Sequence, residues 1–178
     1  MNYSKLFTVK TTMAKEDYHK FLYISTLLKS KMMIIVMVFF TAIISGLIFY
    51  SENQFDLIGF IYYWIILMIV AILAIILKIE MKFKRIIKTD KTGSLDSEEV
   101  LDFYEDFLIV KSKVFEGEIK VKYAQFYEVF ESKDYFITYL NANKATLIRK
   151  KDIESEVINS LRSLYIKNLT NKYKRVNI

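Results

Sequence analysis

Apolar and charged residues occupy separate stretches of this chain. Residues 32–50 read MMIIVMVFFTAIISGLIFY and contain no charged side chain. A second apolar run covers about residues 57–77, and only the polar segment SENQFD separates the two. A helix of about 20 apolar residues can cross a ~30 Å hydrocarbon core. A soluble domain of this size could not cover two helices that are apolar all round. The pattern therefore predicts a two-helix transmembrane hairpin. Two interpretations of Gly46 stay open: a bulky residue of the second helix packs over it, or it faces lipid by chance composition.

Charged residues beside the two runs predict how the hairpin is oriented. Lys29 and Lys31 precede the first run, whereas the intervening loop carries Glu52 and Asp56 and no Lys or Arg. Five cations follow the second run, namely Lys78, Lys82, Lys84, Arg85 and Lys88. Because positively charged flanks stay in the cytoplasm, we expect a multi-pass protein of the cell membrane with both termini inside the cell.

The same five cations are the candidate contacts for anionic lipid. Cations just inside a span attract anionic headgroups by about 1 kcal/mol each. Two interpretations stay open: simple anchoring, with long side chains reaching to the membrane surface, or recognition of anionic lipid. Nucleic acid is not an expected partner, because the segment would lie against the membrane and no nucleic-acid-binding motif accompanies it.

Outside the hairpin the pattern predicts short strands and helices. Residues 6–12 suit a strand, and residues 14–31 suit a helix that continues into the first span, with Thr11 or Thr12 as its cap. A linker, KTDKTGSLDS, precedes a region with strand periodicity and turn residues. The predicted strands cover residues 98–104, 107–115, 117–123, 124–132, 134–140 and 145–150.

An amphipathic helix is predicted at residues 152–169, before the basic tail NKYKRV. Asp152 suits its cap. Its apolar stripe consists of Ile153, Val157, Leu161 and Leu164. Upstream of it the strands are rich in aromatic residues, half of which should be core, while the rest are a candidate recognition surface. These aromatic residues are Tyr123, Phe126, Tyr127, Phe130, Tyr135, Phe136 and Tyr139.

Residues that commonly carry chemistry are scarce. The chain has no cysteine and a single histidine, His19, which is expected at the surface or at an interface and not as a ligand or a base. Asp102, Glu105 and Asp106 lie near a predicted hairpin turn, where carboxylates are expected to be solvated. No glycine-rich phosphate loop and no carboxylate within a span is present. The sequence therefore predicts no catalytic, cofactor-binding or metal-binding residues, and the protein is not expected to be an enzyme.

Short antiparallel strands closed by one helix are the pattern of pleckstrin-homology-like (PH-like) domains. The whole chain also resembles the YcxB-like family of bacterial membrane proteins. The resemblance rests on TTMAKEDYHKF, the hairpin, FYEDFLIV and YAQFYEVFESKDYFITYL. The family often carries Trp where Tyr123 stands and Pro where Arg149 stands, and both departures are compatible with the fold. The resemblance implies architecture and location, and no known activity.

Together these patterns predict an α+β membrane protein with four segments. They are a strand and helix leading into the membrane (1–31), the hairpin (32–79), a basic juxtamembrane segment and linker (80–97), and a PH-like β-domain closed by the C-terminal helix (98–178). We expect a non-enzymatic, membrane-tethered binding or regulatory module on the cytoplasmic face. A narrower version is protection against a membrane-active peptide or toxin. The alternative is a structural accessory subunit of a membrane enzyme or transporter. Expected partners are membrane lipid and an unidentified protein, and homo-oligomerisation stays open.

Overall fold

The computed structural model describes residues 4–29, 31–51, 54–114, 117–141 and 144–176. The chain divides into two compact units, a β unit made of Met1–Asp17 with Asp90–Ile178, and a helical unit, Tyr18–Thr89. The helical unit is thus inserted into the β unit. Glu52 and the side chains of Lys29 and Lys31, which entered the topology prediction, lie outside the described part. So does residue 30, where the first predicted helix was expected to continue into the first span.

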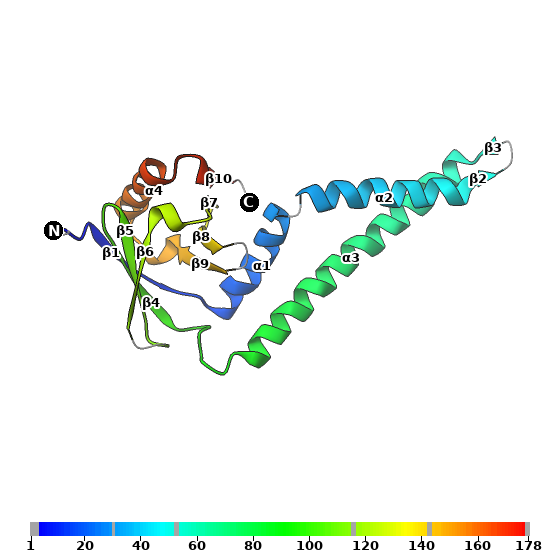
Figure 1. The fold of residues 1–178 in the computed structure, drawn as a ribbon. Coiled ribbons are helices and arrows are strands. Elements are labelled where there is room, and N and C mark those ends of the chain that lie inside the picture. Colours follow the sequence, from blue (N-terminus) through cyan, green and yellow to red (C-terminus); the bar gives the residue numbers. More distant parts are fainter. Residues whose placement is uncertain (1–3, 30, 52–53, 115–116, 142–143, 177–178) are drawn as a thin grey trace. The chain divides into compact units, whose positions relative to one another are not determined.

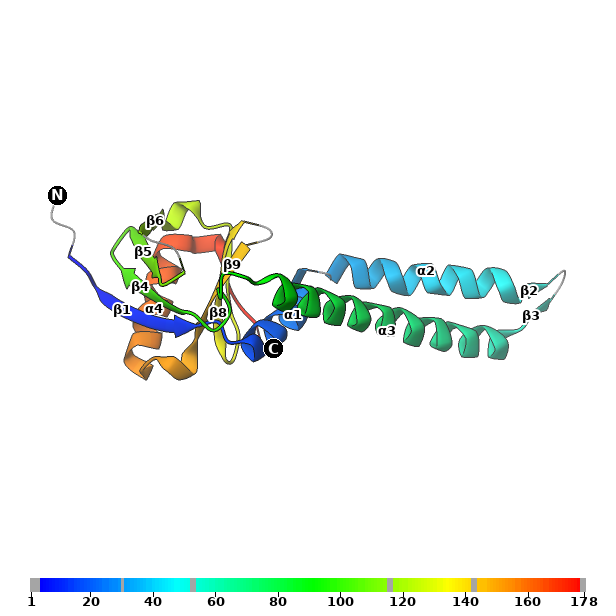
Figure 2. The same ribbon diagram turned by 90° about the horizontal axis from the view of Figure 1, so that it is seen from below.

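Two long helices dominate the helical unit. α2 (Lys31–Phe49) and α3 (Leu57–Thr89) run in opposite directions as a hairpin, close together near the tip and further apart toward their other ends (Figures 1 and 2). The segment predicted as a loop contains two short strands, β2 (Tyr50–Ser51) and β3 (Gln54–Phe55), which pair at the tip. α1 (Lys15–Lys29) precedes α2 and begins at the boundary between the two units.

Among the described residues, α3 is the one helix long and apolar enough to cross a membrane. Its most apolar window has no buried residues. In α2 the described apolar stretch, Ile34–Phe49, is shorter. α3 has 33 residues, which corresponds to roughly 50 Å, so it exceeds the ~30 Å of a hydrocarbon core.

Small and polar side chains of α2 face α3. Ser45 Oγ donates to the carbonyl oxygen of Phe60 at 2.7 Å, and Trp64 Nε1 donates to Thr41 Oγ1 at 3.1 Å. A Cβ added at Gly46 would lie 3.9 Å from the Phe60 ring. The interpretation in which a bulky residue of the second run packs over Gly46 is therefore confirmed.

In the described part of the β unit the strands form two four-stranded sheets. The first has the order β1-β4-β5-β6 and is antiparallel. Its strands are β1 (Phe7–Thr12), β4 (Glu98–Phe103), β5 (Phe107–Ser112) and β6 (Glu118–Lys122). The second has the order β10-β7-β8-β9 and is antiparallel except that β10 is parallel to β7. Its strands are β7 (Glu128–Glu131), β8 (Tyr135–Asn141), β9 (Lys144–Arg149) and β10 (Tyr173–Arg175).

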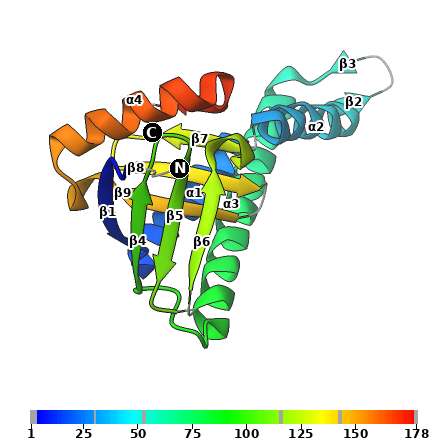
Figure 3. The same cartoon turned by 60° about the vertical axis from the view of Figure 1, so that its left-hand side comes forward.

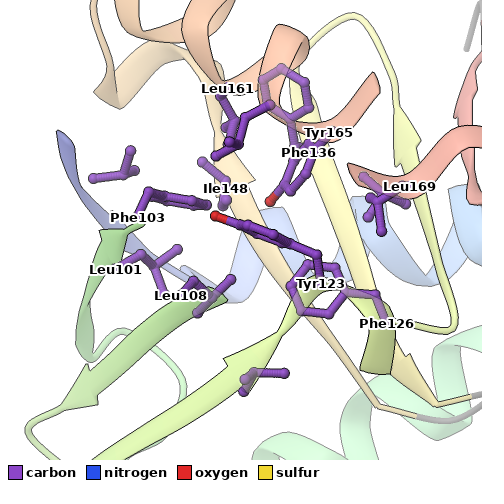
Figure 4. Close-up of a cluster of buried hydrophobic side chains, with 14 residues drawn as sticks. Leu101, Phe103, Leu108, Tyr123, Phe126, Phe136, Ile148, Leu161, Tyr165 and Leu169 are labelled. Atoms are coloured by element: carbon purple, nitrogen blue, oxygen red, sulfur yellow. The ribbon is translucent and has the colours of Figure 1, made fainter. Parts of the chain in front are cut away.

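The two sheets enclose one core, on which α4 (Ser155–Leu169) packs (Figures 3 and 4). The strands of one sheet cross those of the other in the view of Figure 3. Tyr165 of α4 is fully buried and makes edge-on ring contacts with Phe103, Tyr123 and Phe136. The predicted apolar stripe of this helix therefore faces the core, with Leu161 and Leu164 buried.

The N-terminal strand belongs to the β unit. β1 pairs with β4 along its full length, and Val9 is 1% exposed. Thr11 and Thr12 lie within β1, so neither caps α1 as the sequence predicted. The backbone N–H of Lys15 instead donates to Asp96 Oδ1 at 3.2 Å. Asp96 comes after the hairpin in the sequence. No local pattern near residue 15 could therefore identify it as the partner of the start of α1.

Four further details of the structure differ from what the sequence predicted. A 3₁₀ turn, Tyr123–Gln125, comes before β7, so this strand is shorter than predicted. Asp152 lies in another 3₁₀ turn and binds Arg149, whereas Glu154 occupies the N-cap of α4. The basic tail contains strand β10, which is held by pairing with β7. The aromatic stretch is core rather than a recognition surface, because all its members except Tyr127 are buried.

Candidate anion-binding sites

The five cations predicted to contact lipid lie together on one side of α3. All five are exposed. At about 100° per residue they fall within roughly 160° of the helix circumference. Ile79, Phe83 and Ile86 occupy the opposite side by the same geometry. The end of α3 is therefore amphipathic, with a positive face and an apolar face.

The side of α3 away from the cations is occupied by α1. His19 Nε2 lies 2.7 Å from Glu80 Oε1, and the Tyr23 hydroxyl donates to the same oxygen at 2.7 Å. The His19 ring also packs on Phe83, with 4.3 Å between ring centroids. The hydrogen bonds of Glu80 thus come from α1, whereas Lys84 of the positive face acts on it only through charge. His19 is at a helix–helix contact, and no further acidic residue lies between Lys78 and Lys88.

This arrangement permits both interpretations of the cations. Because α3 continues without a break to Thr89, the cations follow the apolar part on the same rigid helix. Lys78 comes directly after the apolar run, where its long side chain can reach headgroups while its stem stays on apolar surface. Lys88 lies in the last turn, where a cation also interacts favourably with the helix dipole.

A second charged cluster, in the β unit, was not predicted. Glu131 at the end of β7 has a side chain only 2% exposed. Lys150 Nζ donates to its Oε1 at 2.8 Å, and Arg162 of α4 donates to both oxygens, at 2.7 and 3.0 Å. The Tyr173 hydroxyl donates to Oε2, and Arg175 Nε lies 3.7 Å from that oxygen. Glu131 therefore joins β7, β10 and α4.

These contacts keep Glu131 ionised. Burial alone would raise the pKa of its carboxyl group, but hydrogen bonds from Arg162, Lys150 and Tyr173 outweigh burial and lower the pKa to about 2. In return, the carboxylate raises the pKa of Arg162 and, together with burial, that of Tyr173. At neutral pH the cluster consists of an anion surrounded by cations.

Two other buried carboxylates are also paired within the β unit. Asp17 accepts hydrogen bonds from the Tyr135 hydroxyl at 2.7 Å and from Arg149 Nη1 at 2.9 Å. Asp102 was expected to be solvated, and that prediction is wrong, since it is 4% exposed. The strands on either side of β4 surround it with polar partners, which are Lys5, Thr8 and Lys111 at 2.6–3.2 Å. Glu105 and Asp106 are exposed, as predicted.

One weak signal in the sequence pointed to Glu131. It is a carboxylate in the aromatic strand segment YEVFES, where a charge on a buried face requires partners. Those partners could not be identified, because they come from three other elements far along the chain. Among the described residues, no group of three or more acidic or histidine side chains could hold a metal ion.

Comparison with known proteins finds a family similarity for one part of the chain. No curated protein and no solved structure matches it. The family model described as YcxB-like protein matches residues 103–164, from the end of β4 into α4. This stretch contains Glu131, Lys150 and Arg162 but not β10. The match confirms the predicted resemblance to the YcxB-like family over these residues.

Proposed function

We propose that this protein is a non-enzymatic binding or regulatory module, anchored in the cell membrane by the α2–α3 hairpin, with its β unit on the cytoplasmic side. The observation that carries the proposal is that the hairpin is an insertion in the β unit. The role of the hairpin is then attachment, and the role of the β unit is recognition. Protection against a membrane-active peptide, and the accessory-subunit alternative, stay predictions.

Exposure of apolar side chains supports the anchoring role. In α2 and α3 many large apolar side chains are more than half exposed, which water would disfavour. Examples are Phe39 at 66%, Leu47 at 74% and Ile58 at 70%. The polar groups of the hairpin, in contrast, point between the helices, as in the contacts of Thr41 and Ser45. Apolar residues outside and polar residues inside suit a hairpin surrounded by lipid.

Strand pairing supports an even number of membrane crossings. β1 precedes the helical unit, β4 follows it, and the two strands pair. The backbone N–H of Asp96 also donates to the carbonyl oxygen of Met13 at 2.9 Å. The chain therefore enters and leaves the helical unit within one folded unit, which can lie on only one side of a membrane. If α3 crosses, α2 is the segment that crosses back.

The position of the cations supports the cytoplasmic orientation. The five cations of α3 lie at the end attached to the β unit, and the tip of the hairpin carries none among its described residues. By the positive-inside rule the β unit then faces the cytoplasm. This topology can be tested with single cysteines, because the chain has none of its own.

We expect a cysteine at position 51, in β2, to react with an impermeant thiol reagent in intact cells. A cysteine at Lys113, an exposed residue after β5, should react only after the cells are permeabilised. Labelling of Lys113→Cys but not of Ser51→Cys in intact cells would indicate the opposite orientation, with the β unit outside. Labelling of both sites, or of neither before permeabilisation, would contradict a spanning hairpin.

A further inference from the structure

We propose that the pocket beside Glu131 binds a phosphate-type anion, either a free phosphate or the phosphomonoester headgroup of a lipid. The proposal goes beyond anchoring and does not depend on it, because every residue it uses belongs to the β unit. It rests on the shape of the pocket, on an excess of positive charge, and on how the cations are held in place.

The pocket is open and has a volume of about 450 Å³. Its wall comes from β7 and the following turn, from the 3₁₀ turn Lys150–Asp152, from α4 and from β10. Five charged residues line it, namely Glu131, Lys133, Lys150, Arg162 and Arg175. Such a volume is ample for a phosphate group and its attached carbon chain or sugar.

Positive charge exceeds negative charge in this pocket. Four cations face a single carboxylate, which leaves a formal excess of three positive charges. A carboxylate offers about four acceptor positions. On Glu131 these are occupied by Lys150, by hydrogen bonds from Arg162 to both oxygens and by Tyr173.

The other two cations make no hydrogen bond to Glu131, although Arg175 forms a longer ion pair with it. Arg175 is 3.7 Å from the carboxylate, beyond hydrogen-bond distance, and its side chain is 66% exposed. Lys133 is exposed, and no described carboxylate lies within ion-pair distance of it. Both line the pocket.

The inner cations are held in fixed positions. Arg162 Nη1 also donates to Asn159 Oδ1 at 2.8 Å, and Lys150 Nζ donates to the carbonyl oxygen of Ser132 at 2.6 Å. Lys150 in addition lies 4.9 Å from the centre of the Phe136 ring. A guanidinium has five N–H donors and an ammonium three, more than Glu131 alone can use.

Glu131 thus positions Lys150 and Arg162, and Lys133 and the loosely paired Arg175 add the further positive charge of the pocket. A phosphate dianion, with its several acceptor oxygens, matches such a group of donors. A role of the cluster in stability alone would account for Arg162, Lys150 and Tyr173. It would not account for Lys133, which lines the same pocket and has no described carboxylate within ion-pair distance.

Binding can be measured on the full chain in a zwitterionic detergent by calorimetric titration. The probes are inorganic phosphate, pyrophosphate and, for the lipid source, short-chain phosphatidic acid, with chloride at equal ionic strength as reference. The test variant is Lys133→Gln with Arg175→Gln, which leaves all four acceptor positions of Glu131 occupied. The matched control is Lys113→Gln with Lys122→Gln, two exposed cations outside the pocket.

We expect saturable binding of phosphate or of phosphatidic acid by the wild type, and roughly tenfold weaker binding by the test variant. The control variant should bind as the wild type does. Equal affinity for phosphate and phosphatidic acid identifies a free phosphate as the ligand. Much tighter binding of phosphatidic acid, lost in the test variant, identifies a lipid headgroup.

Two results would overturn the proposal. One is the absence of saturable binding of all three probes above the chloride reference. The other is binding that the test variant retains as well as the control does. One form of the second result is binding of phosphatidic acid that is lost only when Lys84 and Lys88 are replaced. The lipid would then bind α3 and not the pocket.

Discussion

At the scale of single residues, Glu131 is a buried carboxylate that pairs with three cations. Its carboxylate accepts hydrogen bonds from α4, from β10 and from the 3₁₀ turn before α4. Removing one partner of a buried ion pair is costly, because the opposite charges stay buried and unpaired. Glu131 should therefore be needed for stability, even though ion pairs at the surface contribute little.

We expect Glu131→Gln to lower the free energy of unfolding at neutral pH by about 2 kcal/mol. Because the pKa of Glu131 is lowered in the folded protein, its contribution is complete above its ordinary value of 4.5. The contribution is lost as the pH falls from that value toward about 2. The difference between wild type and variant should therefore shrink across this range.

Thermal unfolding of the full chain in detergent, followed by the near-ultraviolet circular dichroism of its tyrosines, measures this effect. Glu105→Gln is the control, because the Glu105 side chain forms an exposed ion pair with Lys167, and the substitution keeps the backbone carbonyl that accepts from Asn168. A Glu131 variant as stable as the Glu105 variant at neutral pH would show that the cluster is not structural.

At the scale of elements, α3 combines two properties in one uninterrupted helix. Its first two-thirds are apolar and its end is amphipathic, with the five cations on one side. Contacts from His19 and Tyr23 to Glu80 hold α1 on another side of this end. Whether the cations only anchor the helix or also recognise lipid can be decided by removing part of the positive charge.

We expect Lys84→Gln with Lys88→Gln to leave the orientation of the hairpin unchanged, because Lys78, Lys82 and Arg85 still follow the apolar run. The cysteine labelling described above, repeated in this variant, measures orientation.

Recognition of anionic lipid would give a different result with the same variant. Its binding to anionic vesicles would then be weaker by about 2 kcal/mol at low salt. The loss would decrease as salt rises, because exposed charges are screened over about 8 Å at physiological ionic strength. Lys113→Gln with Lys122→Gln is again the control, and an equal loss in that variant would indicate attraction by total charge only.

At the scale of the whole molecule, the helical unit is an insertion between the first two paired strands of the β unit. β1 contributes Val9 to the core, and its Phe7 ring stacks on Phe103 at 5.0 Å between centroids. Without β1, an edge of β4 and part of the core would be exposed to water. The residues before the hairpin are therefore needed for folding of those after it.

We expect residues 90–178 alone to fold poorly, and the same fragment fused to residues 4–17 by a short glycine–serine linker to fold. A short linker suffices because Met13 and Asp96 are joined by a backbone hydrogen bond. The difference in the free energy of unfolding should be at least about 3 kcal/mol, from the apolar surface that β1 covers. Urea unfolding measures it.

A fusion that carries Val9→Asp serves as the control, because it keeps the chain length but places a charge in the core. Equal stability of the fragment with and without β1 would contradict the role given to this strand.

Local patterns in the sequence determined the type and approximate position of most elements. Continuous apolar runs predicted α2 and the apolar part of α3, and alternation predicted strands such as β5 and β8, because each pattern reflects the surroundings of one element only. The amphipathic stripe of α4 was predicted for the same reason. The resemblance to YcxB-like proteins, confirmed for residues 103–164, rested on the same patterns.

Tertiary structure alone decided what these elements contact. Three features depended on chain segments far apart in the sequence: the pairing of β1 with β4 across the helical unit, the parallel addition of β10 to β7, and the cations around Glu131. Periodicity shows that a side chain is buried, but it carries no information about which distant segment buries it. The same holds for charge: Asp102 was expected to be solvated, and the partners of Glu131 could not be identified, because the partners of both carboxylates come from other segments of the folded chain.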